Sequence, residues 1–183
     1  MLKTLSLSGV NAATRLSFYP AGGFSNPGYN KTVECPPGGT DADCDGDKYE
    51  ACVLSEYCNG VSCAPDVQLK LANFLQCFES EHASVMSAAD GCLAAAGFSV
   101  SIVRKCFDGA GKAAAWKMVQ SAAAPHLPSI KCFPWIEVAG TVESKDYQHG
   151  CFGVNAAKTP LLPLICKAAI QGGVTPPDAC ARI

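Results

Sequence analysis

The sequence predicts an α/β fold that is cross-linked by disulfides. Residues 13–19 alternate apolar and polar side chains, as a short strand does, and residues 133–139 form an apolar run that Gly140 closes. Between these two segments, apolar residues recur at helical spacing over residues 66–124, and a last helix is expected after Pro160. The predicted order is therefore strand, helical block, strand and helix.

The cysteine content predicts both the cross-links and the compartment. The 183 residues include 12 cysteines, and the closest two, Cys58 and Cys63, are separated by four residues. Redox dithiols and zinc knuckles both usually place two sulfurs on one tight turn as Cys-X-X-Cys, a pattern that this sequence lacks. We therefore expect structural disulfides, an oxidising lumen or extracellular compartment, and neither a metal nor another cofactor. The disulfide candidates are Cys35, Cys44, Cys52, Cys58, Cys63, Cys77, Cys92, Cys106, Cys132, Cys151, Cys166 and Cys180.

Charge and hydropathy narrow the classes of partner. With 49% apolar and 16% charged residues, the chain has the composition of a compact globular domain. Its net charge is −2 and its Lys and Arg residues form no stripe, so nucleic acid is not expected as a partner. Residues 83–103 are interrupted by Asp90 and two glycines, so no membrane span is expected. Residues 1–13 lack the apolar run of a secretory signal, and targeting information is expected outside this sequence.

The first third of the chain is expected to be rich in loops. The strand over residues 13–19 stops at Pro20, and a Gly- and Pro-rich loop follows to Pro27. Asn30 opens an Asn-Lys-Thr acceptor for N-glycosylation, which fits passage through a secretory compartment. Residues 35–63 hold five cysteines, four glycines and many acidic residues, so we expect a disulfide-stapled excursion in which a helix starts within residues 51–56.

Four helices are predicted in the middle of the chain and one near its end. Asp66 is the expected N-cap of a helix that runs to about residue 84, and the next helices cover residues 85–96, 99–107 with Ser99 as cap, and 110–124, which Pro125 ends. The last helix opens at residues 159–160, and glycines 172 and 173 mark its end. No internal repeat or low-complexity linker occurs, so residues 1–183 are expected to form a single domain.

An ordered series of phrases resembles one known family. The series comprises residues 44–54 around Cys52, the phrases around Cys77, Cys92 and Cys106, the segment Phe-Pro-Trp-Ile-Glu-Val-Ala-Gly at residues 133–140, and residues 164–180. In content and spacing this series resembles the gamma-interferon-inducible lysosomal thiol reductase family over residues 14–180. Eight cysteines take part in the resemblance: 35, 44, 52, 77, 92, 106, 166 and 180.

The resemblance implies a thioredoxin-like fold with a helical insertion. Residues 14–34 would supply a strand and a loop, residues 35–65 a Cys-rich loop region, residues 66–124 the insertion, and residues 130–183 the second thioredoxin half. Pro134 would occupy the position of the cis proline beside the substrate groove. The pairs Cys92 with Cys106 and Cys166 with Cys180 each enclose thirteen residues, and closing loops of that size stabilises by about 3 kcal/mol each in the chain-entropy model.

The sequence departs from the family's pattern at the reactive thiols. The family's reductases place Cys-X-X-Cys or Cys-X-X-Ser where the first strand meets the first long helix, because the helix N-terminus lowers the pKa of the attacking thiol. Residues 13–19 match the family's second strand, so residues 1–11 would at most supply the end of the preceding helix. The family's Gln-His-Gly phrase is replaced by Pro-Pro-Gly-Gly at residues 36–39, and the Gln-His-Gly at residues 148–150 lies elsewhere.

Four cysteines outside the family pattern leave alternatives open. Cys58 and Cys63, separated by Asn-Gly-Val-Ser, favour a small closed hairpin loop, with a redox dithiol as the alternative. Cys132 and Cys151 could close an eighteen-residue loop. A free Cys132 beside Pro134 would instead lie near the substrate groove.

The sequence does not favour a metal site. Residues 41–46 copy the first six places of a calcium loop, but the twelfth place is Cys52 rather than a bidentate Glu, so an acidic solvated loop is the better interpretation. His82, His126 and His149 lack zinc-ligand spacing and are interpreted as surface or packing residues.

Three functional hypotheses follow. The first is a non-catalytic, disulfide-rich member of the family that serves as a structural or binding subunit in an oxidising lumen, with a protein partner that could complete the sheet. The second is a disulfide-reducing oxidoreductase whose Cys-X-X-Cys segment is absent from this sequence. The third is an unrelated Cys-rich binding protein. The sequence favours the first hypothesis, in which the protein is not an enzyme.

Overall fold

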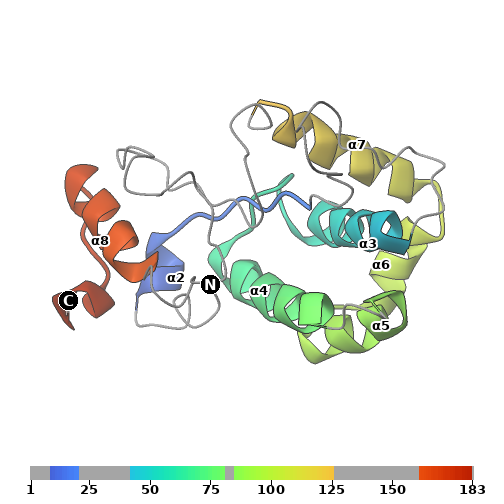
Figure 1. Cartoon of the computed structure of the whole chain (residues 1–183), viewed down its shortest axis with the longest axis horizontal. Helices are drawn as coiled ribbons and strands as arrows, with labels where there is room; N and C mark the ends of the chain where they lie inside the picture. Colours follow the sequence, from blue (N-terminus) through green and yellow to red (C-terminus); the bar gives the residue numbers. More distant parts are fainter. Residues whose placement is uncertain (1–8, 21–41, 81–84, 126–160, 183) are drawn as a thin grey trace, which may run out of the picture. The chain divides into compact units, whose positions relative to one another are not determined.

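The computed structural model describes residues 9–20, 42–80, 85–125 and 161–182. They belong to two compact units, Arg15–Pro125, called here the helical unit, and Met1–Thr14 with His126–Ile183, called here the α8 unit. Helices are the regular elements of the described residues, which contain no strand (Figure 1). The elements are α2 (Val10–Ala13), α3 (Ala42–Tyr57), α4 (Pro65–Ser80), α5 (Val85–Ala95), α6 (Val100–Phe107), α7 (Gly111–Ala123), α8 (Leu161–Gln171) and the 3-10 helix η4 (Asp178–Arg182).

Helix α3 is the centre of the helical unit. It contacts α5, α6 and α7, and Figure 1 shows it between α7 and the pair α4 and α5. Its side chains are buried on all sides from Lys48 to Leu54, including the charged Lys48 and Glu50. The expected loop is therefore wrong for residues 42–50, and the helix that was expected to start within residues 51–56 begins earlier, at Ala42. A helix enclosed on every side has no polar face, so the apolar periodicity that reveals a surface helix is missing from its sequence.

The helices that follow confirm the predicted helical block. Leu71, Phe74 and Phe78 on α4 are buried, as their spacing predicted. The predicted cap at Asp66 is wrong by two positions, because the helix begins at Pro65. Proline suits a first helical position, since its missing N–H would have no intrahelical acceptor there, and an acidic residue in the first turn complements the helix dipole.

An aromatic cluster forms the core of the helical unit. The Tyr49 ring packs edge-on against Phe107, with centroids 5.3 Å apart, and lies 6.3 Å from Phe74 and 6.1 Å from Phe78. Trp116 on α7 is fully buried in the same core. The cluster joins α3, α4, α6 and α7 through large apolar surfaces, which dominate the energetics of small cores.

The first predicted strand is wrong. Residue 13 ends helix α2, and residues 14–20 are extended with one isolated bridge, Ser17 to Ser62. The alternating pattern has a different cause, because Phe18 packs against the core of the helical unit while Ser17 is exposed. A segment that rests on helices in this way shows the periodicity of a strand without a partner strand beside it.

The α8 unit contains the last helix at its predicted place. The N–H of Val174 donates to the carbonyl of Ala169 and that of Gly173 to Ile170, with Gly173 at φ +67°. These two bonds form a Schellman motif, in which the left-handed residue is usually glycine. The predicted end at glycines 172 and 173 is confirmed.

Several further expectations concern residues outside the described part of the chain. The strand at residues 133–139, Pro134 and the acceptor Asn30 lie outside the described residues, as do Cys35, Cys132, Cys151 and the three histidines. No helix in the described part of the chain combines the length and apolarity that a bilayer crossing needs.

Candidate functional site

Disulfide bonds are the main chemical feature of the described residues. Four are formed within them: Cys52–Cys106, Cys58–Cys63, Cys77–Cys92 and Cys166–Cys180. Cys44 is disulfide-bonded as well, and the described residues include no free cysteine. The sulfur atoms in this part of the chain are therefore held in covalent cross-links.

One expected pairing is wrong. Cys92 and Cys106 are not joined to each other, since Cys92 bonds to Cys77 of α4 and Cys106 bonds to Cys52 of α3. Helix packing explains the difference, because α5 lies against α4 whereas α6 lies against α3. Cys166 and Cys180 are joined to each other as expected, and their bond ties α8 to η4.

Two Cys-X-X-Ser sequences were missed by the sequence analysis, at residues 52–55 and 77–80. Both lie inside helices, the first in α3 and the second in α4. Cys52 is completely buried and Cys77 is bonded to Cys92. A redox thiol needs access to its substrate and benefits from a helix N-terminus, and neither cysteine has that combination.

The loop between α3 and α4 carries the Cys58–Cys63 disulfide, whose two cysteines, unlike those of the other described disulfides of the helical unit, lie outside helices. Cys58 follows the last residue of α3 and is half-buried, whereas Cys63 is separated from α4 by Ala64 alone and is buried. Asn59 and Ser62 exchange backbone hydrogen bonds of 2.9 and 3.4 Å across the turn, and Gly60 adopts φ +68°. The small closed hairpin loop expected from the sequence is present here.

A polar cluster connects α3, α5 and α6. The Tyr49 hydroxyl donates to Asp90 Oδ1 at 2.7 Å, and Arg104 Nε donates to both Asp90 carboxylate oxygens at 2.9 and 3.1 Å. The Arg104 guanidinium also lies 5.5 Å from the Tyr49 ring centroid, a cation–π distance. The Asp90 carboxylate on α5 therefore accepts hydrogen bonds from side chains of two other helices, α3 and α6.

The titration of this cluster follows from its contacts. Burial alone raises the pKa of Asp90, but the hydrogen bonds from Arg104 and Tyr49 outweigh burial, and the pKa is lower than the ordinary Asp value. Burial is the main cause that raises the Tyr49 pKa, and its bond to Asp90 adds to the effect. The hydrogen bond to Asp90 raises the Arg104 pKa. All three groups thus keep their ordinary charge state at neutral pH, which suits a structural clamp better than proton transfer.

The structure contradicts a calcium loop at residues 41–46. Asp45 and Gly46 lie inside helix α3, and the Asp45 carboxylate is 4.0 Å from Lys112 Nζ. The acidic loop that was preferred over calcium is also wrong from residue 42 onward, because the backbone there is helical. Within the described residues, no group of His, Cys, Asp or Glu has a geometry that could hold a metal ion.

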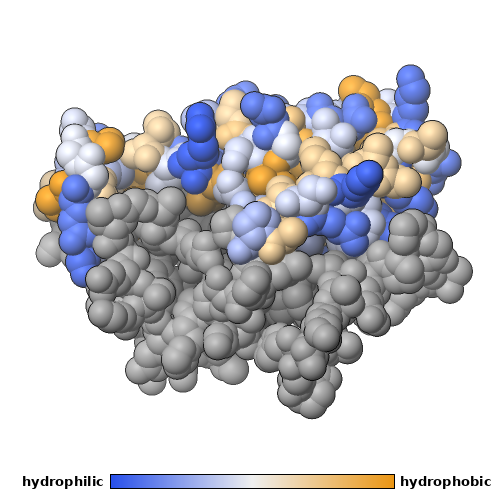
Figure 2. Space-filling view, turned by 90° about the horizontal axis from the view of Figure 1, so that it is seen from above, coloured by the Kyte–Doolittle hydropathy of each residue, from blue (hydrophilic) through white to orange (hydrophobic). Residues whose placement is uncertain are grey.

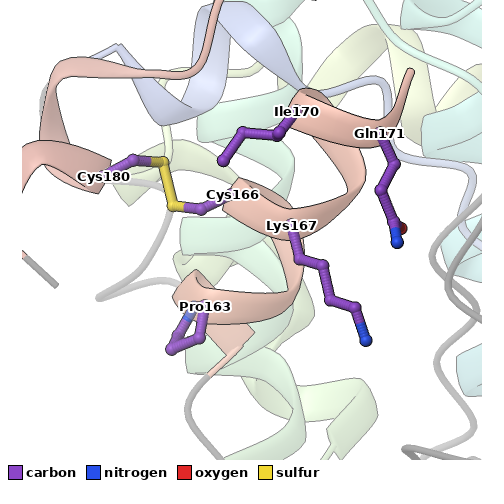
Figure 3. Close-up of a pocket in the computed structure, with 6 residues that line it drawn as sticks. All are labelled: Pro163, Cys166, Lys167, Ile170, Gln171 and Cys180. Carbon is purple, nitrogen blue, oxygen red and sulfur yellow. A yellow bond between two sulfur atoms is a disulfide. The ribbon is translucent and has the colours of Figure 1, made fainter. Parts of the chain in front are cut away.

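A hollow on the α8 unit is lined mostly by apolar atoms. Figure 3 shows the residues around it, with the Cys166–Cys180 disulfide at one side and Ile170 nearby. Ile170 is 65% exposed, and Val174, just beyond the helix end, is also exposed. The lining residues are Pro163, Cys166, Lys167, Ile170, Gln171 and Cys180. They include no pair of groups suited to acid–base or nucleophilic chemistry.

The visible surface of the described residues is mixed. Figure 2 shows hydrophilic and hydrophobic residues interspersed on the face that it presents. Single exposed apolar residues of this kind, such as Ile102 on α6, are normal on soluble domains and mark no site by themselves.

Comparison with known proteins gives one family. The model of the family described as gamma interferon inducible lysosomal thiol reductase matches residues 1–96. No curated protein and no solved structure gives a significant match. The matched residues include Cys52 and Cys77 and extend through helix α5.

Proposed function

Because the chain belongs to the gamma interferon inducible lysosomal thiol reductase family, we propose that it is a non-catalytic member, a disulfide-rich module that acts as a structural or binding subunit in an oxidising lumen. One observation carries this proposal. Every cysteine that the structure describes is disulfide-bonded, and the sequence contains no Cys-X-X-Cys.

The positions of the sulfurs support the same conclusion. Cys52, which begins one Cys-X-X-Ser sequence, has no exposed surface, and its partner Cys106 is 5% exposed. Thiol–disulfide exchange requires a thiolate to approach the sulfur that it attacks, so this bond is shielded from any protein substrate. Its location at the contact of α3 with α6 is that of a cross-link.

An oxidising compartment follows from the number of these bonds. Disulfides persist in secretory, lysosomal and extracellular spaces and are rare in reducing ones. We propose such a lumen for this chain, together with a thioredoxin-like second half at residues 130–183, in which Pro134 would border the groove. We also propose that Asn30 carries a glycan and that the chain binds a protein partner.

A reductase assay tests the proposal. The full chain, purified in its oxidised form, is added to insulin and a dithiol, and insulin reduction is followed as turbidity. We expect the rate to equal that of the dithiol alone, because no described thiol is available for exchange. Catalysed turnover that disappears when Cys58 and Cys63 are both replaced by Ala would overturn the proposal.

A second candidate is an active reductase. The family's description names this activity, and the match through residue 96 favours keeping it. In that case the thiol pair would lie in a segment that this sequence does not contain. Intact-mass measurement of the native protein, together with its transcript sequence, separates the two candidates, because a longer chain carrying Cys-X-X-Cys supports only the second.

A further inference from the structure

Asn59 and Gly60 form an Asn-Gly sequence in the loop between α3 and α4. We propose that Asn59 is a self-modification site, at which the backbone nitrogen of Gly60 attacks the side-chain amide, expels ammonia and leaves aspartate or isoaspartate at position 59. The reaction needs no enzyme or cofactor, and its co-reactant is water. The proposal does not depend on the proposed function, because it concerns the chemistry of a single peptide unit.

The Asn59 side chain can approach its own backbone. It is exposed, and within the described part of the chain its amide group makes no hydrogen bond. Asn side chains in turns often bond to the backbone two residues further on, and such a bond would hold the amide away from the attacking nitrogen. Because that bond is not formed here, nothing in the described residues restrains the amide.

The attacking nitrogen is accessible as well. The Gly60 N–H makes no hydrogen bond to a described residue, and a Cβ built at Gly60 would meet nothing within 4 Å. Its φ of +68° lies in the left-handed region, which favours glycine over residues with a side chain. The turn therefore favours, at position 60, the residue type that hinders closure of the ring least.

Ring closure must also rotate the peptide unit between Asn59 and Gly60. The Asn59 N–H donates to the Ser62 carbonyl at 2.9 Å, and the Ser62 N–H donates to the Asn59 carbonyl at 3.4 Å. Only the second bond involves the peptide unit that rotates, and it is longer than a usual N–H···O bond. The first bond and the Cys58–Cys63 disulfide can keep the loop closed during the rotation. Ring closure therefore costs one weak hydrogen bond rather than the opening of the loop.

The reaction balances without a redox change. The Gly60 nitrogen gives up its proton to solvent and bonds to Asn59 Cγ, while the bond from Cγ to the side-chain nitrogen breaks and that nitrogen leaves as ammonia. Water then opens the cyclic succinimide. Hydrolysis at Cγ gives aspartate, and hydrolysis at the backbone carbonyl gives isoaspartate, in which the main chain runs through the former side chain. Because the attacking nitrogen is deprotonated, the rate should rise with pH.

The products differ from the natural loop in charge and in backbone length. A carboxylate replaces a neutral amide two residues beyond Tyr57, the last residue of α3, where the helix dipole disfavours a negative charge. In the isoaspartate product the main chain between positions 59 and 60 is longer by one carbon, so the paired backbone groups of Asn59 and Ser62 lose their register. The reaction therefore changes both the charge and the shape of an exposed loop.

Asn73 shows that exposure alone is not sufficient. It is exposed on α4, but the residue after it, Phe74, is fully buried. In an α-helix each N–H is directed to the carbonyl four residues earlier, so the backbone cannot turn its nitrogen onto the preceding side chain. Asn73 is thus an internal control. The variant D90N supplies a closer one, because it places a side-chain amide directly before Gly91 inside α5.

The experiment follows the full oxidised chain and its D90N variant during long incubation at neutral pH, folded in buffer and unfolded in guanidinium chloride. Samples are digested under mildly acidic conditions, and mass spectrometry with electron-based fragmentation distinguishes asparagine, aspartate and isoaspartate. In the folded chains we expect Asn59 to convert to both products at least about ten times faster than Asn73 or the amide introduced by D90N, a difference of about 1.4 kcal/mol in the barrier. In denaturant the two Asn-Gly sites of D90N should convert at similar rates, because α5 is then unfolded.

Three results would overturn the proposal. The first is an unchanged Asn59 in the folded chain while the unfolded chain converts, which would show that the loop protects it. The second is an equal rate at Asn59 and at position 90 of folded D90N. The third is aspartate without isoaspartate, which would indicate direct hydrolysis instead of a succinimide. If D90N fails to fold, the comparison with Asn73 in the natural chain decides. Incubation at mildly acidic pH should slow the conversion, and an equal or faster rate there would contradict attack by a deprotonated nitrogen.

Discussion

Removing the Cys52–Cys106 disulfide should destabilise the chain far more than removing Cys58–Cys63. The first bond joins α3 to α6 across a sequence separation of 54, and the second closes a loop with a separation of 5. In the chain-entropy model the stabilisation is about 4 kcal/mol for the long loop and about 2 kcal/mol for the short one. The double variants C52A/C106A and C58A/C63A therefore differ by about 2 kcal/mol from this source alone.

Packing adds to the difference. Cys52 and Cys106 are core residues, so replacing their sulfurs with hydrogen leaves unfilled space between α3 and α6. Deleting a buried group of this size costs about 1 kcal/mol. Alanine is preferred to serine here, because a buried hydroxyl would add a polar group that needs a partner.

Urea unfolding of both variants, followed by far-ultraviolet circular dichroism, measures the difference. We expect C52A/C106A to have the lower midpoint, and a change in the slope would show that its unfolded state is more expanded. The C58A/C63A variant is the matched control, since it also lacks one bond and two sulfurs. Equal midpoints for the two variants would refute the reasoning that the buried bond between α3 and α6 is the main cross-link of the helical unit.

The remaining predictions concern two glycines and the polar cluster. A Cβ at Gly91 on α5 would meet nothing within 4 Å, so G91A should raise the free energy of unfolding by about 0.5–1 kcal/mol. A Cβ at Gly109 would lie 2.6 Å from the Lys105 carbonyl oxygen, so G109A should lower the free energy of unfolding by about 1–3 kcal/mol. If thermal unfolding shows that G91A and G109A change the stability in the same direction, that result contradicts the structure. The Asp90 pKa is lower in the folded chain than in the unfolded chain, so its contribution is fully present above about pH 4 and is lost as the pH falls through the folded pKa. Unfolding measured from pH 6 to pH 2 should therefore show a shallower acid loss for D90N than for the natural chain, and parallel curves would count against the role of Arg104. Y49F keeps the ring but removes the donor to Asp90 and should cost about 1 kcal/mol, a loss that is absent when the same change is made in D90A, which has no acceptor at this position.

The sequence predicted the helices whose faces differ in polarity. On α4 the residues Leu71, Phe74 and Phe78 are buried in the core, while the residues between them, apart from the small Ala72, are exposed or half-buried, and this difference is visible in the order of residue types. Glycines 172 and 173 marked the end of α8 because a left-handed residue there favours glycine. These are local signals, and local structure follows them.

The predictions that the structure contradicts failed for one physical reason, because each depended on tertiary contacts. The charged residues Lys48 and Glu50 are buried on the central helix α3, which no local pattern can reveal. The pairing of Cys92 depends on which helix lies against α5, and loop length alone does not determine that. The extended segment 14–20 imitates a strand because Phe18 contacts the helical core.

The sequence predicted that the candidate site would contain disulfides, but it did not predict the polar cluster. The even number of cysteines and the absence of Cys-X-X-Cys predicted disulfides, and four are formed in the described residues. The cluster of Tyr49, Asp90 and Arg104 was not foreseen, because its members are up to 55 residues apart in the sequence and meet only when α3, α5 and α6 pack. Arg104 on α6 and the C-cap residue Asp108 do have the i,i+4 spacing of a local charge pair, but this spacing does not indicate the contact with Asp90.

Titration of free thiols most directly tests whether the cysteines of this protein are held in cross-links. The oxidised full chain is exposed to iodoacetamide, first in native buffer and then in denaturant, without reductant at either step, and its intact mass is recorded. We expect no label to be taken up in either condition. Rapid labelling of two cysteines in native buffer would instead reveal a ready dithiol and assign the chain to the working oxidoreductases of its family.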